Sequence, residues 1–454
     1  MSSKHEANWD RLGEFVARQI EKRGVPGAAV GVLCEGETRA AGFGVTNADH
    51  PQSVTDETLF QIGSITKTFT GTAVMRLVEM GKLDLDGAVR TYVPDFKVAD
   101  ETASAQATIR HLLTHTAGWT GDFFHDTGAG DDALPRYVAD MADLEQLAPI
   151  GTVWSYNNAG FYLAGHIIET VTGKRYEAAL KELVFEPLGL EHCFFDPGDV
   201  MTYRFAVGHH GGDGGAQVAR PWPLPRAAYA AGGITCQVHD LLRYARFHMG
   251  DGTAEDGTRL LTSESLALMQ SPQVTLWGDE TWGLTWSLNV VDGARQVSHG
   301  GGTTGQVSLL TLIPERQFAV AIFTNAGEGG AVTADGTKWA LKEYLGLETP
   351  DPEPIESSEE ELAAYAGRYT RPMVDIELGV LCGRLIGQMV YKAGFPSRDV
   401  PPPPPPPPVT LALCEKDRLL GMDGPFKDAK AEIIRRPDGS IGWLRLGRIH
   451  KRQA

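Results

Sequence analysis

A stretch of proline and acidic residues, TPDPEPIESSEE at 349–360, divides the chain into two parts of different character. Proline lacks a backbone N–H donor and clustered carboxylates favour water, so this stretch predicts an exposed linker. Helix-like and strand-like segments alternate before it, whereas short strand-like runs follow it. The sequence therefore predicts a first domain over residues 1–348, a linker over 349–360 and a second domain over 361–454.

The order of elements in the first domain favours an α+β fold. Helical spacing of apolar residues predicts helices, and strand-like runs predict strands, along the whole of this domain. The segments are two strands at 25–36 and 37–46, helices at 9–23, 61–83, 108–115 and 158–172, and strands at 284–291, 306–313 and 318–324. This order predicts one antiparallel sheet, with edge strands from both ends of the domain and a helical cluster inserted between them.

The second domain reads as a small β-barrel or sandwich. Strand-like runs with turn residues between them cover 374–391, 409–422 and 440–449. Between the first two runs lies VPPPPPPPPV at 400–409, whose eight prolines cannot donate backbone hydrogen bonds. This run predicts a polyproline II loop, which serves either as a stiff spacer or as a ligand for the aromatic groove of a partner.

Charge and composition exclude several classes of function. The formal net charge of −17 argues against binding to nucleic acid or to an anionic membrane surface, because both require clustered Lys and Arg. The N-terminus has no apolar signal-like segment, and no stretch is apolar enough to span a bilayer. The five cysteines are scattered and form no CxxC pair, which favours reduced thiols. We therefore expect a cytoplasmic protein.

A Ser-x-x-Lys sequence, Ser64 to Lys67, lies where a helix is expected to begin. The free N–H groups of a helix start favour a developing negative charge. Lys67 is three residues on and shares a helix face with Ser64. A serine hydroxyl becomes a good nucleophile only when a base takes its proton, and a lysine in an apolar pocket can be neutral enough to do so. A capping serine beside a solvated lysine is the alternative.

Two further patterns carry polar groups that could meet at one cleft. Tyr156 and Asn158 form a Tyr-x-Asn sequence before a helix, and they offer a phenol and an amide. His299 begins a His-Gly-Gly-Gly sequence that leads into a strand. Its glycines, including Gly301 and Gly302, would let a substrate lie close to the backbone.

Together these motifs resemble those of the penicillin-recognising serine hydrolases, the β-lactamase-like superfamily of class C β-lactamases, D-aminopeptidases and related esterases (peptidase S12-like). The resemblance covers roughly residues 9–345. It rests on LFQIGSITKTFTGTAVMRLVEMGKLDLD, ATIRHLLTHTAGW, VWSYNNAGFYLAGHIIETVTG, AAGGITCQVHDLLRY and HGGGTTGQVSLLTLIP, in that order. It implies a β-lactamase/transpeptidase-like fold with an all-helical subdomain. The tail resembles the lipocalin-like barrel appended to some peptidases.

The resemblance also implies roles for individual residues. It makes Ser64 the nucleophile, Lys67 its base and Tyr156 the proton shuttle to the leaving group. The remaining implied residues bind substrate: Asn158 would orient Lys67 and the substrate amide, His299 replaces the lysine of many relatives, and Gly301 and Gly302 line the cleft, with the N–H groups of Ser64 and Gly302 as oxyanion hole.

The implied activity is hydrolysis of amide or ester bonds in small peptide-like substrates, most of all as a peptidase. A carboxylesterase with weak β-lactamase activity and a slowly turning over penicillin-binding protein are the alternatives. Without the lysine that anchors a carboxylate, we expect inefficient hydrolysis of β-lactams. No cofactor or metal is implied, and the expected partners are a small molecule or short peptide and, as a further option, other copies of the chain.

Three weaker signals lie outside these motifs. His111 and His115 have zinc-compatible spacing, but Leu-Leu-Thr between them lacks a catalytic glutamate, which favours a structural turn. The acidic and aromatic stretch 119–135 could either line the cleft or form a solvated surface loop. Trp277, Trp282 and Trp286 are expected in the core and at its rim.

Overall fold

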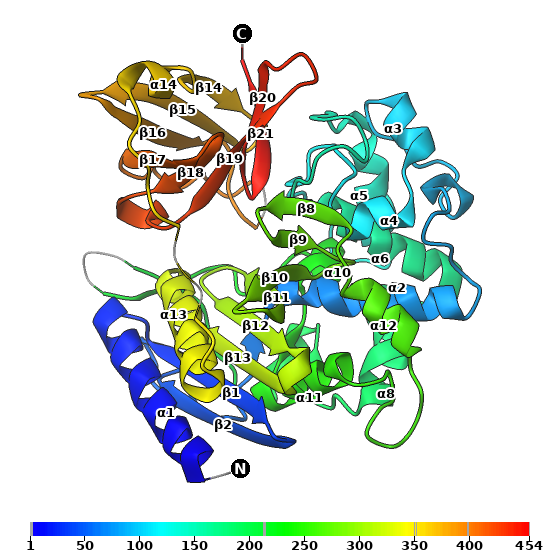
Figure 1. Ribbon diagram of the computed structural model, residues 1–454. Coiled ribbons are helices and arrows are strands. Elements are labelled where there is room, and N and C mark those ends of the chain that lie inside the picture. Colours follow the sequence, from blue (N-terminus) through cyan, green and yellow to red (C-terminus); the bar gives the residue numbers. More distant parts are fainter. Residues whose placement is uncertain (1–2, 212–214, 349, 351, 397–398, 454) are drawn as a thin grey trace.

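The computed structural model describes residues 3–211, 215–348, 350, 352–396 and 399–453 (Figure 1). Its first part is built on an antiparallel sheet of order β2-β1-β13-β12-β11-β10-β9-β8. These strands are β1 Gly27–Cys34, β2 Glu37–Gly44, β8 Val274–Trp277, β9 Glu280–Trp282, β10 Ser287–Val291, β11 Ala294–Gly302, β12 Val307–Ile313 and β13 Phe318–Thr324. The predicted antiparallel sheet is confirmed.

The sheet edges come from both parts of the domain, as expected: β2 precedes the helical cluster and β8 follows it. The last strand, β13, lies inside the sheet between β1 and β12. The reason is that every residue of β13 is buried. A strand without a polar face is stable only when other strands and helices cover it on all sides. The edges are β2 and β8.

Helices cover both faces of this sheet. Alternate residues of β1 point in opposite directions, so Val30 packs with α1 (Ser3–Arg23) and α13 (Gly330–Ala340), whereas Ala29 packs in the core that contains α11 (Val238–Met249). The two faces thus bury two separate apolar cores. A smaller sheet of β3 (Phe60–Gln61), β7 (Thr235–Cys236) and β4 (Cys193–Phe194) and a β5–β6 ribbon (His209–His210, Gln217–Val218) complete the strands.

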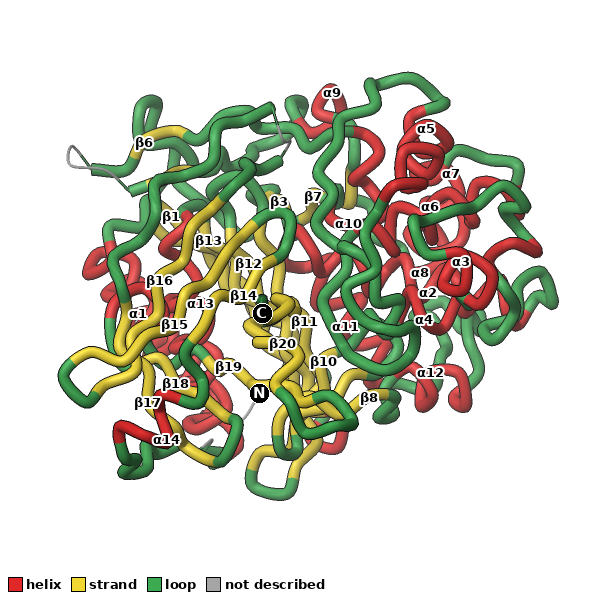
Figure 2. The backbone as a smooth tube through the Cα atoms, turned by 90° about the horizontal axis from the view of Figure 1, so that it is seen from above, coloured by secondary structure: helices red, strands yellow, loops and turns green. Residues whose placement is uncertain are grey.

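The predicted helical cluster lies to one side of the strands (Figure 2). Its central helix, α2, is buried around most of its circumference, as expected for a helix in the middle of a cluster. The helices are α2 Thr66–Glu79, α3 Glu101–Gln106, α4 Ile109–Leu113, α5 Ala133–Asp140, α6 Ala159–Thr172, α7 Tyr176–Leu180, α8 Glu186–Leu188, α9 Pro197–Val200, α10 Tyr229–Gly232 and α12 Ser263–Met269. In the described residues no helix is long and apolar enough to cross a membrane.

The C-terminal part is a closed barrel of eight strands, which confirms the predicted barrel. It closes because β14 pairs with β21, with Tyr369 opposite Arg452. The strands are β14 Gly367–Thr370, β15 Val374–Leu381, β16 Arg384–Tyr391, β17 Val409–Glu415, β18 Arg418–Gly421, β19 Lys430–Arg435, β20 Ile441–Leu446 and β21 Arg448–Arg452. Helix α14 (Glu359–Ala363) precedes them and begins inside the predicted linker. The exact domain limits stay a prediction.

One hairpin of the barrel docks into the first domain. The turn between β20 and β21 contains Gly447, whose carbonyl accepts a hydrogen bond from the backbone N–H of Tyr156 at 3.1 Å. The backbone N–H of Ile449 donates to Ser155 Oγ at 3.2 Å, and Trp443 Nε1 donates to the carbonyl of Leu147 at 2.8 Å. The barrel therefore reaches the segment that carries the Tyr-x-Asn motif.

Candidate active site

Ser64 lies in a single 3-10 turn, Gly63–Ile65, directly before α2. Gly63 adopts a φ of 52°, in the left-handed region that favours glycine. A Cβ at this position would lie 2.6 Å from the backbone nitrogen of Gly302 at the end of β11. Glycine at 63 therefore lets the Ser64 turn and the β11 backbone come together, with the N–H groups of Ser64 and Gly302 close to one another.

The side chain of Lys67 is 1% exposed and contacts the Ser64 hydroxyl. Its Nζ lies 3.1 Å from Ser64 Oγ and 2.6 Å from the carbonyl oxygen of Ala231. Burial lowers the Lys67 pKa well below its usual range, the charge of Arg448 lowers it further, and Asp122 opposes both. A neutral amine has a lone pair, so it can accept the Ser64 proton while it donates to Ala231.

Tyr156 packs against the side chains of Arg448 and Lys67. Its ring lies 4.7 Å from the Arg448 guanidinium and 5.0 Å from Lys67 Nζ, measured to the ring centroid. Its hydroxyl is buried and lies near the Ser64 hydroxyl, without a well-formed hydrogen bond to any described residue. Burial raises the pKa of Tyr156, although the Ser64 hydroxyl and Arg448 oppose this. The phenol is therefore protonated and can donate its proton to a group that enters the site.

His299 on β11 holds a neutral imidazole. Its Nδ1 lies 2.6 Å from the carbonyl oxygen of Gly300, which can only accept, so Nδ1 carries the proton. Burial and the charge of Lys67 lower the His299 pKa to about 3. Its Nε2 is a buried acceptor without a partner in the part of the chain that the structure describes. The position where many relatives have lysine thus carries no positive charge here.

Asn158 belongs to a charged cluster that joins the two domains. Its Nδ2 donates to Asp122 Oδ1 at 2.8 Å, and Asp122 also accepts from Arg448 and Arg371, each at 2.8 Å. Burial alone would raise the Asp122 pKa, but the two guanidinium groups outweigh it and hold the pKa at about 2. We expected Asn158 to orient Lys67, whereas its amide nitrogen donates to Asp122.

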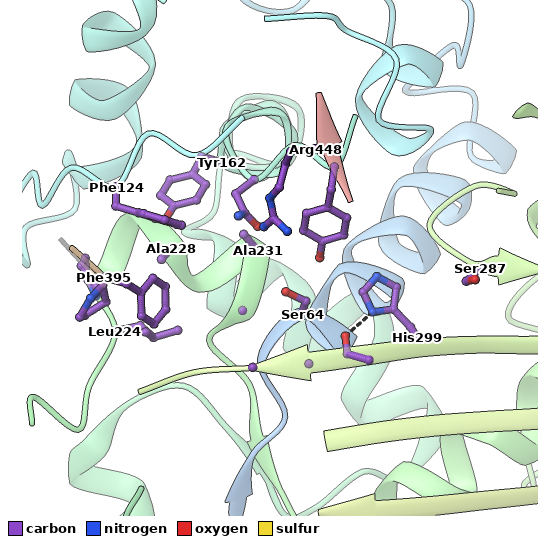
Figure 3. A pocket seen from close by; sticks show the side chains of 18 of the residues that line it. Ser64, Phe124, Tyr162, Leu224, Ala228, Ala231, Ser287, His299, Phe395 and Arg448 are labelled. Carbon is purple, nitrogen blue, oxygen red and sulfur yellow. Dashed lines mark hydrogen bonds between the residues drawn. The ribbon is translucent and has the colours of Figure 1, made fainter. Parts of the chain in front are cut away.

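A cavity of about 490 Å³ collects most of the predicted residues (Figure 3). Lys67 is not among its lining residues, but its amine forms a hydrogen bond with Ser64. The lining residues are Ser64, Phe124, Tyr156, Asn158, Tyr162, Leu224, Pro225, Ala228, Ala231, Gly232, Trp282, Ser287, His299, Gly300, Gly301, Gly302, Phe395, Pro396 and Arg448. Every predicted site residue therefore lies at this cavity or in contact with Ser64.

Sequence reasoning missed the residues that the barrel supplies. Arg448 and Phe395 line the cavity but lie in segments that the sequence indicated only as barrel strand and loop. The sequence predicts one strand-like run over 440–449, and no local pattern shows which surface the turn at Gly447 meets. Asp122 and Phe124 come from the stretch 119–135, which is thereby shown to line the cleft in part.

The weaker signals also have structural positions. His111 Nδ1 accepts from the Thr108 backbone N–H at the start of α4, and His115 Nδ1 accepts from the Asn157 backbone N–H. No cluster of potential metal ligands occurs within the described ranges. Trp286 is fully buried in the core, but Trp282 lines the cavity, so one of the expected core and rim tryptophans is part of the site.

Comparison with known proteins agrees with this geometry. The family model described as Beta-lactamase matches residues 12–343. The chain belongs to the beta-lactamase family. This confirms the family resemblance drawn from the motifs, and the relatives in this family are serine hydrolases.

Three similar proteins match most or nearly all of this chain. Penicillin-binding protein 4 of Amycolatopsis lactamdurans is 37% identical over 374 residues, which are 80% of this chain and 97% of that protein. The crystal structure of SurE has a TM-score of 0.76 at 24% identity and covers 99% of this chain and 100% of its own. The octameric penicillin-binding protein homologue from Pyrococcus abyssi has a TM-score of 0.66 at 26% identity, with coverages of 97% and 99%.

The charge of Arg448 makes a prediction for the pH dependence of activity. With Lys67 as the expected base of Ser64, activity is expected to rise with pH through the Lys67 pKa. Arg448→Gln removes a cation that lowers the Lys67 pKa and leaves the negative charge of Asp122 less neutralised. Both effects raise the Lys67 pKa, so the rising limb of the pH profile will move to higher pH by about one unit. Asp122→Asn will move the limb down. Profiles of kcat/KM with a p-nitrophenyl ester measure both, and shifts in the same direction would contradict this account.

Proposed function

We propose that this protein hydrolyses amide or ester bonds of short peptide-like substrates through an acyl-enzyme on Ser64, and that peptides are its main substrates. One observation carries the proposal: the buried Lys67 amine lies 3.1 Å from Ser64 Oγ and has a pKa well below that of a free lysine. A base in contact with a hydroxyl is what nucleophilic catalysis by serine needs.

In the acylation step, Ser64 Oγ forms a bond to the substrate carbonyl carbon while its proton passes to Lys67 Nζ. The carbonyl oxygen becomes an oxyanion near the backbone N–H groups of Ser64 and Gly302. Tyr156 gives its phenolic proton to the leaving nitrogen or oxygen, and it is reprotonated from Lys67. The bond to the leaving group breaks and leaves an ester on Ser64.

In the deacylation step, water attacks the ester carbonyl carbon. Its proton passes through Tyr156 and Lys67 to Ser64 Oγ as the ester bond breaks, so the free carboxylic product and the original hydroxyl are restored. His299 Nε2 can accept a hydrogen bond from the entering water, because it is an unprotonated acceptor at the cavity. No step requires a metal or an organic cofactor.

The sheet supports a peptide as substrate. Strand β10 pairs with β11 only as far as Ser287 opposite Ser298, whereas β12 continues along β11 to Gly302. Within the described residues, the segment 299–302 therefore has a strand on one side only. An extended peptide can pair with such an edge. A Cβ on Gly302 would meet no atom within 4 Å, so there is room for a substrate there.

A slowly turning over penicillin-binding protein is the second candidate, because the 37% identical relative carries that name. A carboxylesterase would use the same acyl-enzyme with an easier leaving group. The neutral His299 argues against efficient β-lactam hydrolysis, since it offers no cation to a substrate carboxylate.

One panel of substrates separates these candidates. We expect turnover of L- or D-amino-acid and short-peptide p-nitroanilides, turnover of short p-nitrophenyl esters, and slow turnover of nitrocefin. Intact mass spectrometry should show an adduct that disappears with the peptide substrates. Turnover of esters without any anilide would favour the esterase, and a lasting penicillin adduct without anilide turnover would favour the penicillin-binding protein.

We also propose that the chain forms homo-oligomers, which is supported by the octameric Pyrococcus abyssi homologue. Light scattering after gel filtration tests this against the 49.1 kDa mass of one chain. The absence of nucleic-acid and membrane partners and the cytoplasmic location stay predictions.

A further inference from the structure

One end of the active-site cavity is apolar. Figure 3 shows Phe124, Leu224, Ala228 and Phe395 gathered on one side of Ser64, whereas His299 and Ser287 lie on the other. None of these four apolar residues takes part in the chemistry proposed above. An apolar wall next to a reacting serine gains stability when an apolar group of a substrate covers it.

The barrel supplies an essential part of this wall. Phe395 lies in the segment between β16 and β17, and its ring meets Phe124 edge to face with centroids 5.0 Å apart and planes at 83°. The Phe395 residue is nevertheless 38% exposed. A large apolar side chain that remains this exposed at a cavity has surface left for a ligand to bury.

Contacts within the barrel hold Phe395 in place. The backbone N–H of Lys392 donates to the carbonyl of Met373 at 2.8 Å, and Gln388 Nε2 donates to the carbonyl of Pro406 in the proline run at 2.9 Å. Gly394 packs so closely that a Cβ there would lie 2.0 Å from the carbonyl oxygen of Val400. The polyproline run thus acts as a stiff support for the segment with Phe395, which fits the spacer interpretation of this run.

The arrangement around Ser64 indicates which part of a substrate meets this wall. The leaving group must receive its proton from Tyr156, whose ring lies 6.3 Å from that of His299 and 6.3 Å from that of Trp282. We infer from this that the leaving group lies on the His299 side of Ser64. The apolar wall lies across Ser64 from His299, so it faces the acyl part of the substrate.

We propose that Phe124, Leu224, Ala228 and Phe395 form a subsite for a large apolar side chain in the acyl part of the substrate, and that the barrel residue Phe395 sets this preference. The proposal rests on the acyl-enzyme function given above. It assigns the barrel a role in substrate selection and narrows the substrate class to peptides with an aromatic or large aliphatic residue on the acyl side of the cleaved bond.

Two esters that differ only in the acyl side chain test the subsite. We expect the wild-type protein to have a kcat/KM about 10- to 100-fold higher for the p-nitrophenyl ester of N-acetylphenylalanine, in its preferred enantiomer, than for that of N-acetylglycine. Phe395→Ala should lower this ratio about tenfold, and Phe395→Leu should keep it within about threefold. Gly394→Ala should lower the ratio too, because the added methyl group displaces the segment that carries Phe395 while the Phe395 side chain itself is kept.

Leu381→Ala is the matched control, because Leu381 is a 65% exposed apolar residue on β15 of the same barrel and lies outside the cavity lining. It should leave the ratio unchanged. If Phe395→Ala left the ratio of the two kcat/KM values unchanged, even with an equal loss for both esters, the proposed subsite would be overturned. If Ser64→Ala still hydrolysed both esters at the wild-type rate, the acyl-enzyme function itself would fail, so the two failures are distinguishable.

Discussion

Replacing Ser64 by alanine will lower kcat for peptide and ester substrates by at least about 10⁴-fold. The substitution removes the oxygen that forms the acyl-enzyme, so Lys67 has no hydroxyl to deprotonate at 3.1 Å. Ser64 is half-buried at the cavity and replaces no core residue, so the fold should be retained. Steady-state kinetics, with circular dichroism as the check on folding, measure this effect.

Ser287→Ala is the matched control for Ser64→Ala. Ser287 lines the same cavity but lies on β10, whereas the Lys67 amine contacts Ser64 Oγ and the carbonyl of Ala231. We expect less than about a tenfold change in kcat. A fluorophosphonate probe should label wild type and Ser287→Ala and fail to label Ser64→Ala. Equal losses in the two variants would contradict the assignment of Ser64 as nucleophile.

Replacing Lys67 by methionine will slow acylation by at least about 10³-fold. Methionine fills a similar volume, but its thioether sulfur is not basic enough to accept the Ser64 proton at neutral pH. Lys67→Arg should fail as well, because a guanidinium keeps its proton at any accessible pH and cannot act as the base. If Lys67 served only as a positive charge, the arginine variant would retain activity, so this pair of variants separates the two roles.

The measurement is the rate of the first p-nitrophenol release in a stopped-flow experiment, which reports acylation alone. Lys82→Met serves as the control, since Lys82 is an exposed lysine just beyond the end of α2. The double variant of Ser64→Ala with Lys67→Met should be no slower than Ser64→Ala, because residues that act in one step are not additive. A further loss in the double variant would show that Lys67 acts in some other way.

The barrel is part of the site in this structure. Arg448 contributes a charge that lowers the pKa of Lys67, and Phe395 contributes an apolar wall. Asp122 links the domains through two guanidinium groups in a buried cluster, where removal of one partner would leave the others uncompensated. In the proposed function, substrate selection and the strength of the Lys67 base therefore depend on contacts between the domains.

The local elements and the catalytic motif could be predicted from the sequence. Ser64 and Lys67 are three residues apart at the start of a helix, so helical geometry alone places both on one face. Several strands of the sheet and of the barrel followed from short strand-like runs and the turn residues between them. Each of these inferences depends on neighbours within a few residues along the chain.

The order of strands and the second half of the site were decided by tertiary structure. The interior place of β13 follows from burial on both faces, which a short apolar run alone does not specify. Asp122 and Arg448 are 326 residues apart in sequence, and their contact exists because the β20–β21 turn docks beside Tyr156. Docking between domains depends on the shapes and charges of two complete surfaces, and no periodicity along the chain encodes it. The sequence alone therefore determined that Ser64 and Lys67, the proposed nucleophile and base, share one helix face, whereas packing of the barrel against the first domain determined their surroundings.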